Sequence, residues 1–502
     1  MELLSNLALG FQVAVTFQNL LYAFFGVLLG TLIGVLPGIG PVPTIAMLLP
    51  ITYNLPPVSA LIMLAGIYYG AQYGGSTTAI LVRMPGEASS IVTMIDGHAM
   101  ARNGRAGAAL AIAALASFTA GTIATLVIGA FAQPLGKLAL LIGPEDYFAL
   151  IVLGLAFSVV LASGSILNAV VSVLIGIVLA SVGTDVETGV QRLTFGQPSL
   201  LEGIGIAVLA MGFFGVGEIL RNLETSEAKH AIAMAIGRLW PSREEFRRSV
   251  GPALRGTAVG SLLGPLPGSG TLLAPFASYV LEKRLSRTPE RFGRGAPEGV
   301  AGPEAANNAA AQTCFIPLMS LGLPPNAVMA LMLGALTIHG ISPGPQVFTK
   351  YPELFWGMVV SMWIGNLMLL VINLPLIGLW VSLLRVPYRL LYPAILLFCC
   401  IGLYSVNQLP ADIFFMAAFG VVALLLMKLG LETTPLVLGF VLGDALEANF
   451  RRTLILSDGD WLSFVRSPLA VTLLACAVLL VAVTLLPKLR QGRTEIFQEP
   501  AS

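Results

Sequence analysis

Four short interruptions in otherwise apolar sequence contain the residue types that could hold a small anion. They are Pro37 to Gly40, Met84 to Ala88, Leu266 to Gly270 and Leu323 to Ala327. Proline and glycine break helices, because proline lacks an N–H group and clashes with the preceding turn while glycine bends freely. A helix that starts again after such a break presents unpaired N–H groups and the positive end of its dipole, which suit a carboxylate. The breaks therefore predict anion binding at half-helix ends.

Hydroxyl, amide and backbone groups in and near the breaks are the candidate ligands. Carbonyl groups freed near Gly38 and Gly268 could also coordinate Na⁺, because hard cations prefer oxygen ligands. The competing interpretation is that the breaks only kink packed helices. We predict a substrate site formed by Pro37, Gly38, Gly40, Ser76, Thr77, Thr78, Arg83, Pro85, Gly86, Glu87, Ser89, Gly268, Ser269, Gly270, Asn307, Asn308, Pro324 and Asn326.

Arg83 has two alternative roles that the sequence leaves open. It precedes the Pro85 break inside an apolar run, where a cation indicates function. Its guanidinium could bind a substrate carboxylate through two hydrogen bonds. It could equally extend to the membrane surface or pair with Glu87, four residues further on.

Two other patterns favour a structural role over a ligand site. Glycines recur every four residues from Gly26 to Gly34 and from Gly256 to Gly264, which is typical of closely packed helices. Asp444 and Glu447 precede Arg451 and could form a coupling site, but a salt-bridged helix end is the commoner arrangement.

The composition indicates that the breaks lie in a membrane. The chain has 502 residues, of which 56% are hydrophobic and 11% charged, whereas a soluble protein has about 25% charged residues. At about 20 residues per crossing, it could form about 10–12 transmembrane helices. The net charge of +1 gives no indication of nucleic-acid binding. We therefore predict an all-α polytopic membrane protein embedded in the lipid bilayer.

The apolar segment Gly256–Leu281 predicts a re-entrant hairpin. Basic residues from Arg221 to Arg255 and from Lys283 to Arg294 flank it, so both flanks should be cytoplasmic. Its 26 residues are too few for two full crossings. Two arms of about 12 residues would each reach roughly 18 Å at 1.5 Å per residue and would turn at Leu266–Gly270.

An internal repeat divides the chain into two halves. Gly26–Gly40 and Gly256–Gly270 share eight of fifteen residues without a gap. We predict a first membrane repeat at 1–221, a cytoplasmic linker at 222–249, a second membrane repeat at 250–486 and a cytoplasmic tail at 487–502.

The loops after the second break of each half suggest that the repeats are inverted. The Asp96–Arg105 loop contains Arg102 and Arg105 and should be cytoplasmic, whereas the equivalent loop, Gly340–Pro352, contains only Lys350. Inverted repeats with hairpins and discontinuous helices are typical of secondary transporters, whose site lies at the repeat interface near the membrane midplane.

Several motifs resemble the large membrane subunit of the tripartite tricarboxylate transporters, and the resemblance covers nearly the whole chain. The chain departs from the family pattern at Pro325-Asn326, where a Gly-Ser pair is usual, and at Arg83, where a small polar residue is usual. The motifs that carry the resemblance are Gly34–Gly40, Ala65–Thr78, Pro85–Ala88, Asp96-Gly97, Gly104–Gly107, Leu266–Gly270, Pro303–Asn308 and Ile338–Gly340.

The resemblance implies a multi-pass symporter of the bacterial inner membrane that takes up tricarboxylates, dicarboxylates or related organic anions. It also implies a periplasmic substrate-binding protein and a small membrane subunit as partners, and no enzymatic activity or cofactor. The coupling ion, Na⁺ or H⁺, stays open, and a homo-oligomer is compatible with the pattern. The alternative, a polytopic membrane enzyme acting on a lipid-linked substrate, would need clustered acids, histidines or a nucleophile–base pair, which the sequence does not offer. A channel would not need two broken repeats.

Overall fold

Helices form almost all of the regular structure in the computed structural model, which describes residues 2–36, 40–83, 86–162, 165–185, 187–224, 236–267, 270–383 and 388–484. Within these ranges, six shorter apolar helices of 10–17 residues accompany six segments that are long and apolar enough to cross a membrane. The prediction of an all-α polytopic membrane protein is confirmed. The six longer segments are Phe17–Gly34, Ile91–Ala139, Pro144–Leu161, Ile206–Glu224, Pro352–Asn373 and Pro410–Lys428.

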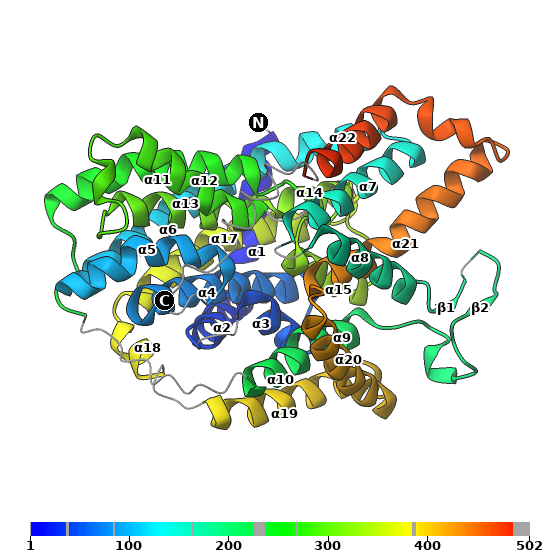
Figure 1. Cartoon of the computed structure of the whole chain (residues 1–502), viewed down its shortest axis with the longest axis horizontal. Coiled ribbons are helices and arrows are strands. Elements are labelled where there is room, and N and C mark those ends of the chain that lie inside the picture. Colours follow the sequence, from blue (N-terminus) through cyan, green and yellow to red (C-terminus); the bar gives the residue numbers. More distant parts are fainter. Residues whose placement is uncertain are drawn as a thin grey trace.

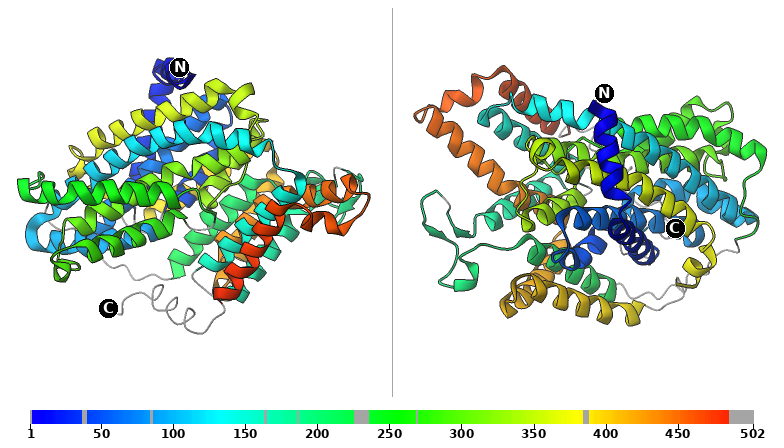
Figure 2. Two further views of the ribbon diagram at one scale, coloured as in Figure 1. Left: turned by 90° about the horizontal axis from the view of Figure 1, so that it is seen from above. Right: turned by 180° about the vertical axis from the view of Figure 1, so that it is seen from behind.

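The helices gather into neighbouring groups that are visible in Figures 1 and 2. One contains α5 (Ile91–Met100), α6 (Ala106–Ala139), α11 (Arg243–Leu263), α12 (Gly270–Leu285) and α13 (Glu298–Thr313). A central group contains α1 (Glu2–Ala14), α2 (Phe17–Gly34), α3 (Pro41–Leu48), α4 (Pro57–Val82) and α17 (Pro352–Asn373).

Two further groups lie beside these. The group at the right of Figure 1 contains α7 (Pro144–Leu161), α8 (Ile166–Ala180), α21 (Thr433–Leu456) and α22 (Pro468–Thr484). The lower group contains α9 (Ile206–Ala210), α10 (Gly217–Glu224), α19 (Tyr388–Asn407) and α20 (Pro410–Lys428). Shorter helices connect the groups: α14 (Phe315–Leu321), α15 (Ala327–Ile338), α16 (Val347–Lys350) and α18 (Ile377–Leu383).

Glycine allows one helix pair in each half to approach closely, and the two pairs match. A Cβ atom added to Gly30 of α2 would lie 2.3 Å from the carbonyl oxygen of Ile67 in α4. In the second half, a Cβ atom on Gly260 of α11 would lie 2.2 Å from the carbonyl oxygen of Ala306 in α13. The glycines one turn before and after each of these make equivalent contacts. The packing role predicted for the glycine spacing is confirmed.

All four predicted interruptions separate helices in the structure. After the second one the α-helix does not resume at once, because the chain first forms a 3₁₀ turn, η2 (Ala88–Ser90), before α5 starts at Ile91. The helix ends that flank the interruptions are Gly34 and Pro41, Val82 and Ile91, Leu263 and Gly270, and Leu321 and Ala327.

Helices α11 and α12 pack against each other in antiparallel directions, while their re-entry into the membrane stays a prediction. Arg255 of α11 donates two hydrogen bonds to the Glu282 carboxylate of α12, from Nε at 2.8 Å and Nη2 at 2.6 Å. The polar stretch before Arg255 is not a loop up to that residue, because α11 already begins at Arg243. Ser242 caps its first turn: the Ser242 hydroxyl accepts from the Glu245 N–H at 3.3 Å, and the Glu245 carboxylate accepts from the Ser242 N–H at 2.8 Å.

Parts of the predicted basic loops contact one another. Arg105 pairs with Glu245 at the start of α11, and the Asn103 side chain donates to the carbonyl of Arg294 at 3.4 Å. The expected loop from Asp96 to Arg105 is shorter than predicted, because Asp96 lies inside α5 and only Ala101–Arg105 departs from regular α-helix.

Asp96 fixes α5 to the segment that follows α12. Its Oδ1 accepts from the backbone N–H groups of Gly293 at 2.9 Å and of Gly295 and Ala296 at 2.8 Å. Its Oδ2 accepts from the Tyr279 hydroxyl at 2.9 Å. The carboxylate is fully buried, and these four donors replace its hydration.

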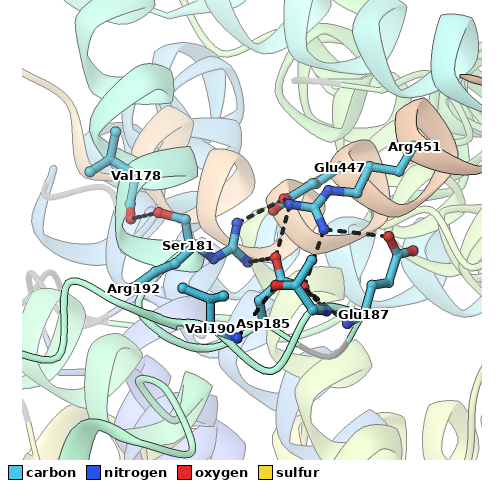
Figure 3. A network of polar contacts seen from close by, with 9 residues as sticks. Val178, Ser181, Asp185, Glu187, Val190, Arg192, Glu447 and Arg451 are labelled. Atoms are coloured by element: carbon cyan, nitrogen blue, oxygen red, sulfur yellow. Dashed lines mark hydrogen bonds and ion pairs between the residues drawn. The ribbon is translucent and has the colours of Figure 1, made fainter. Parts of the chain in front are cut away.

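A small β-hairpin projects from the helices and is attached by ion pairs. Its strands are β1 (Gly183–Thr184) and β2 (Gln191–Arg192). Figure 3 shows Arg451 of α21 contacting Asp185 at 2.8 Å and Glu447 at 2.6 Å, while Arg192 contacts Glu447 at 2.7 Å. The structure thus favours the salt-bridged helix end over a coupling site at Glu447.

The antiparallel return of α12 beside α11 predicts that both ends of this helix pair lie on one side of the membrane. Arg247 lies near the start of α11 and Arg287 just after the end of α12; both are exposed and take no part in the Arg255–Glu282 contact. In a cysteine-free background, Arg247→Cys and Arg287→Cys should both react with a membrane-impermeant maleimide in inside-out vesicles and neither in right-side-out vesicles. Labelling of the two positions from opposite sides would rule out a re-entrant hairpin.

The ion pairs of the β-hairpin predict a pH-dependent stability. Hydrogen bonds from Arg451 and from the backbone of Thr188 and Glu187 hold the pKa of the Asp185 carboxyl well below its usual range. The stability that this gives is present above the unfolded-state pKa of about 3.9 and is lost as the pH falls further.

Asp185→Asn should therefore lower the Tm of the purified protein near neutral pH, and the difference from wild type should shrink below about pH 4. Asp458→Asn is the matched control, since Asp458 is exposed and no ion pair is found for it among the described residues. A Tm difference for Asp185→Asn that stays constant down to about pH 3 would contradict the assignment.

Candidate functional site

The two interruptions of the first half pack directly against each other. A Cβ atom on Gly40, the residue before α3, would lie 3.2 Å from the carbonyl oxygen of Gly86 in the second interruption. A Cβ atom on Gly86 would in turn lie 2.4 Å from the Cα of Gly75 in α4. A side chain at Gly86 would clash with Gly75, and one at Gly40 would be tight against Gly86, so the first two interruptions form one closely packed backbone cluster.

Helices that follow the interruptions also pack against each other across the two halves. Helix α12, after the third interruption, packs against η2 and α5, which follow the second. Helix α3, after the first interruption, packs against α15, which follows the fourth. In each case the helix after a hairpin turn contacts the helix after the other half's second break.

Asn307 connects this cluster to the buried helix α13. Its Nδ2 donates to Glu87 Oε1 at 3.1 Å, which joins the second half to the second interruption. The Asn307 side chain is buried, and its Oδ1 has no hydrogen-bond partner among the described residues. Two of the predicted site residues are thus brought together from positions 220 residues apart.

Helix α13 carries further polar side chains on the same side as Asn307. Three of them follow Glu304 by three, four and eight residues, so they share one side of the helix. We call this set the polar face of α13: Glu304, Asn307, Asn308 and Gln312. Gln312 Nε2 donates to Asn308 Oδ1 at 3.1 Å, and Gln312 Oε1 accepts from the Thr125 hydroxyl of α6 at 2.9 Å. Burying such a row of polar side chains in an apolar assembly costs free energy, which makes the row a candidate functional site.

Glu304 is the residue that the sequence reasoning missed. Its Oε1 accepts from the hydroxyls of Ser76 in α4 at 2.8 Å and Thr93 in α5 at 2.7 Å, and its Oε2 accepts from Ser117 in α6 at 3.4 Å. The side chain is 4% exposed. A signal was available, because Glu304 is an acidic residue inside a stretch of alanine and glycine, which marks a functional site in a membrane protein.

Other predicted site residues serve mainly local structure. The Thr78 hydroxyl contacts the Val35 carbonyl at 3.0 Å, just past the end of α2, and the Thr77 hydroxyl donates to the Tyr73 carbonyl in its own helix at 3.1 Å. Asn326 caps α15, since its Oδ1 accepts from the Met329 N–H at 2.9 Å. Ser89 and Pro324 are buried, and Gly270 is the first residue of α12.

Arg83 ends α4 in a left-handed conformation, with φ 56°. Its side chain is exposed, and no ion pair to Glu87 is found among the described residues, where Glu87 instead contacts Asn307. The pairing alternative is therefore not supported, and the choice between a substrate contact and a surface position stays a prediction.

Five predicted site residues lie outside the described residues: Pro37, Gly38, Pro85, Gly268 and Ser269. The predicted Na⁺ positions near Gly38 and Gly268 lie there too. Within the described ranges, no group of three or more His, Cys, Asp or Glu side chains is placed to hold a metal ion.

The fold and the site define a multi-pass α-helical membrane protein in which interrupted helices surround a buried polar row. Comparison with known families is more specific. The model of the tripartite tricarboxylate transporter TctA family matches residues 20–438, and the chain belongs to this family. It is a family of transporters and not of enzymes, as the resemblance implied.

Two relatives come from Agrobacterium vitis. One, described as an uncharacterized 52.8 kDa protein in the TAR-I ttuC' 3' region, is 56% identical over 499 residues, 99% of each chain. The other, an uncharacterized protein in the TAR-II ttuC' 3' region, is 55% identical over 240 residues, which are 48% of this chain and 99% of the relative. No solved structure shows significant similarity to the chain.

The alternative in which Arg83 binds the substrate makes a prediction that the surface position does not. A hydrogen bond to a charged group is worth about 1.5–3 kcal/mol, so Arg83→Gln should reduce carboxylate uptake roughly 10- to 100-fold at the same membrane abundance. Arg83→Lys should retain part of the activity, since it keeps the charge and loses the planar fork. Arg102→Gln, which changes an exposed arginine in the Ala101–Arg105 loop, is the matched control. Normal uptake by Arg83→Gln would exclude the role.

Proposed function

We propose that the chain is the permease subunit of a cation-coupled uptake system for dicarboxylates or tricarboxylates in the bacterial inner membrane. The single observation that supports this most strongly is the family match over residues 20–438. In this proposal, a periplasmic binding protein delivers the organic anion and a small membrane subunit accompanies the permease.

The packing of the interruptions supports a site between the two halves. Gly40, Gly86 and Gly75 are in backbone contact, and α12 and α15 of the second half pack against η2 and α3 of the first. The helix start at Gly270 offers N–H groups without internal partners, which favour a carboxylate. The start of α3 adds only the Val42 N–H, because Pro41 and Pro43 have none and the Thr44 N–H donates to the Gly40 carbonyl at 3.3 Å. We therefore place the substrate near this cluster, with Asn307 and Arg83 as candidate side-chain ligands.

We further propose that the halves are inverted repeats and that α11 and α12 form a re-entrant hairpin. The matching glycine contacts of α2 with α4 and of α11 with α13 support a common packing unit. The reciprocal contacts of α3 with α15 and of α12 with α5 support two units facing one another. Alternating access would then come from movement of one unit relative to the other.

Uptake by the reconstituted complex tests the proposal. Proteoliposomes with the permease, the small subunit and the binding protein would be given radiolabelled citrate, tartrate, malate or succinate under separate Na⁺ and pH gradients. Accumulation of at least one carboxylate against its gradient, abolished when the driving ion gradient is collapsed, is the expected result. Uptake that only equilibrates the substrate, or that needs no ion gradient, would contradict the proposal.

A further inference from the structure

A water-sized cavity beside Glu304 joins the two halves of the molecule. Its volume is about 10 Å³, which is about enough for one water molecule. Oxygen-bearing side chains line one part of it and apolar side chains the rest. The oxygen-bearing residues are Tyr73, Ser76 and Thr77 of α4, Glu304 of α13 and Asn373 of α17.

Glu304 is a buried carboxylate whose partners are neutral. It accepts hydrogen bonds from the hydroxyls of Ser76, Thr93 and Ser117, and no ion pair with a basic side chain is found for it within the described ranges. An ionised carboxylate out of water costs several kcal/mol when no opposite charge accompanies it. An ionised Glu304 would therefore lack a balancing positive charge among the described residues.

Two further oxygens at the cavity also lack partners. Asn373 is 2% exposed, and its Nδ2 donates to the Leu369 carbonyl at 2.9 Å, while its Oδ1 has no partner among the described residues. The buried Tyr73 hydroxyl has none either. An amide oxygen can only accept, so Asn373 needs a donor or a cation.

We propose that this cavity binds the coupling ion and that the ion is Na⁺, held by the Glu304 carboxylate together with oxygens of Ser76, Tyr73 and Asn373. This inference rests on the proposed function, in which a cation drives uptake. A proton on Glu304 would supply a single donor and would need no cavity, whereas Na⁺ is a hard cation that contacts several oxygens at once.

The position of the cavity explains how the ion would act on the substrate. Glu304 lies one helical turn from Asn307, which contacts Glu87 at the second interruption. Ser76 follows Gly75, which touches Gly86. Without the ion, the negative charge of Glu304 would repel a carboxylate substrate at the nearby cluster, and Na⁺ removes this repulsion. The ion would thus have to bind for the substrate to bind well.

Binding of ²²Na⁺ to the purified chain in nanodiscs tests the site without any need for transport. Glu304→Gln should weaken Na⁺ binding at least tenfold, and Asn373→Ala should weaken it several-fold. The matched control is Glu218→Gln, which changes a half-buried glutamate in α10. Wild-type affinity in Glu304→Gln, or no Na⁺ binding by the wild type, would overturn the inference.

A thermal measurement keeps the test informative if a variant is poorly stable. Na⁺ should raise the Tm of the wild type and of Glu218→Gln in a concentration-dependent way relative to K⁺, because a ligand that binds only the folded state stabilises it. Glu304→Gln and Glu304→Asp should show a smaller shift or none. An equal shift in all variants would count against the site.

The two proposals can fail separately. Carboxylate uptake driven by a pH gradient alone, with no Na⁺ binding, would overturn the Na⁺ site and leave the proposed function standing. Na⁺ binding that depends on Glu304 in a complex that transports no carboxylate would support the site and contradict the proposed function.

Discussion

A backbone that leaves its helix inside an apolar protein must find partners for its N–H and C=O groups, and this requirement organises the centre of the molecule. The described residues meet this requirement in part with hydroxyl groups, as where the Thr44 hydroxyl donates to the Gly40 carbonyl at 2.8 Å. Gly40, Gly86 and Gly75 bring three backbone segments close together. The Thr78 hydroxyl donates a hydrogen bond to the Val35 carbonyl, just past the end of α2. Helix α13 then adds a polar face beside this cluster. The candidate site therefore depends on the positions of the helix ends as well as on the side chains of α13.

Much of the fold follows from residue types that the sequence displays openly. Proline with glycine or asparagine marks the interruptions, and glycine every fourth residue marks the closely packed pairs, because both are local consequences of backbone geometry. The antiparallel return of α12 beside α11 also followed from charge on both flanks. By contrast, the start of α11 at Arg243 depends on the Ser242–Glu245 capping box, a motif that the basic character of the segment obscured.

The candidate site could be predicted only in part, because its contacts join distant segments. Asn307 and Glu87 were both expected there, but their direct hydrogen bond depends on how α13 crosses the second interruption. Glu304 depends even more on the fold, since its three hydroxyl partners come from α4, α5 and α6. Asp96 was expected in a loop, but it lies buried inside α5. Its carboxylate accepts from three backbone N–H groups of a distant segment, which its neighbours in sequence could not indicate.

The matched glycine rows have a mechanical consequence. Where the carbonyls of Ile67 and Ala306 lie against Gly30 and Gly260, no side chain separates the two backbones that could change rotamer and let them slide. We therefore expect α2 and α4 to move together as one rigid pair, and α11 and α13 as another. A conformational change that moves substrate across the bilayer would then have to occur between these two rigid helix pairs, where the chain is already interrupted.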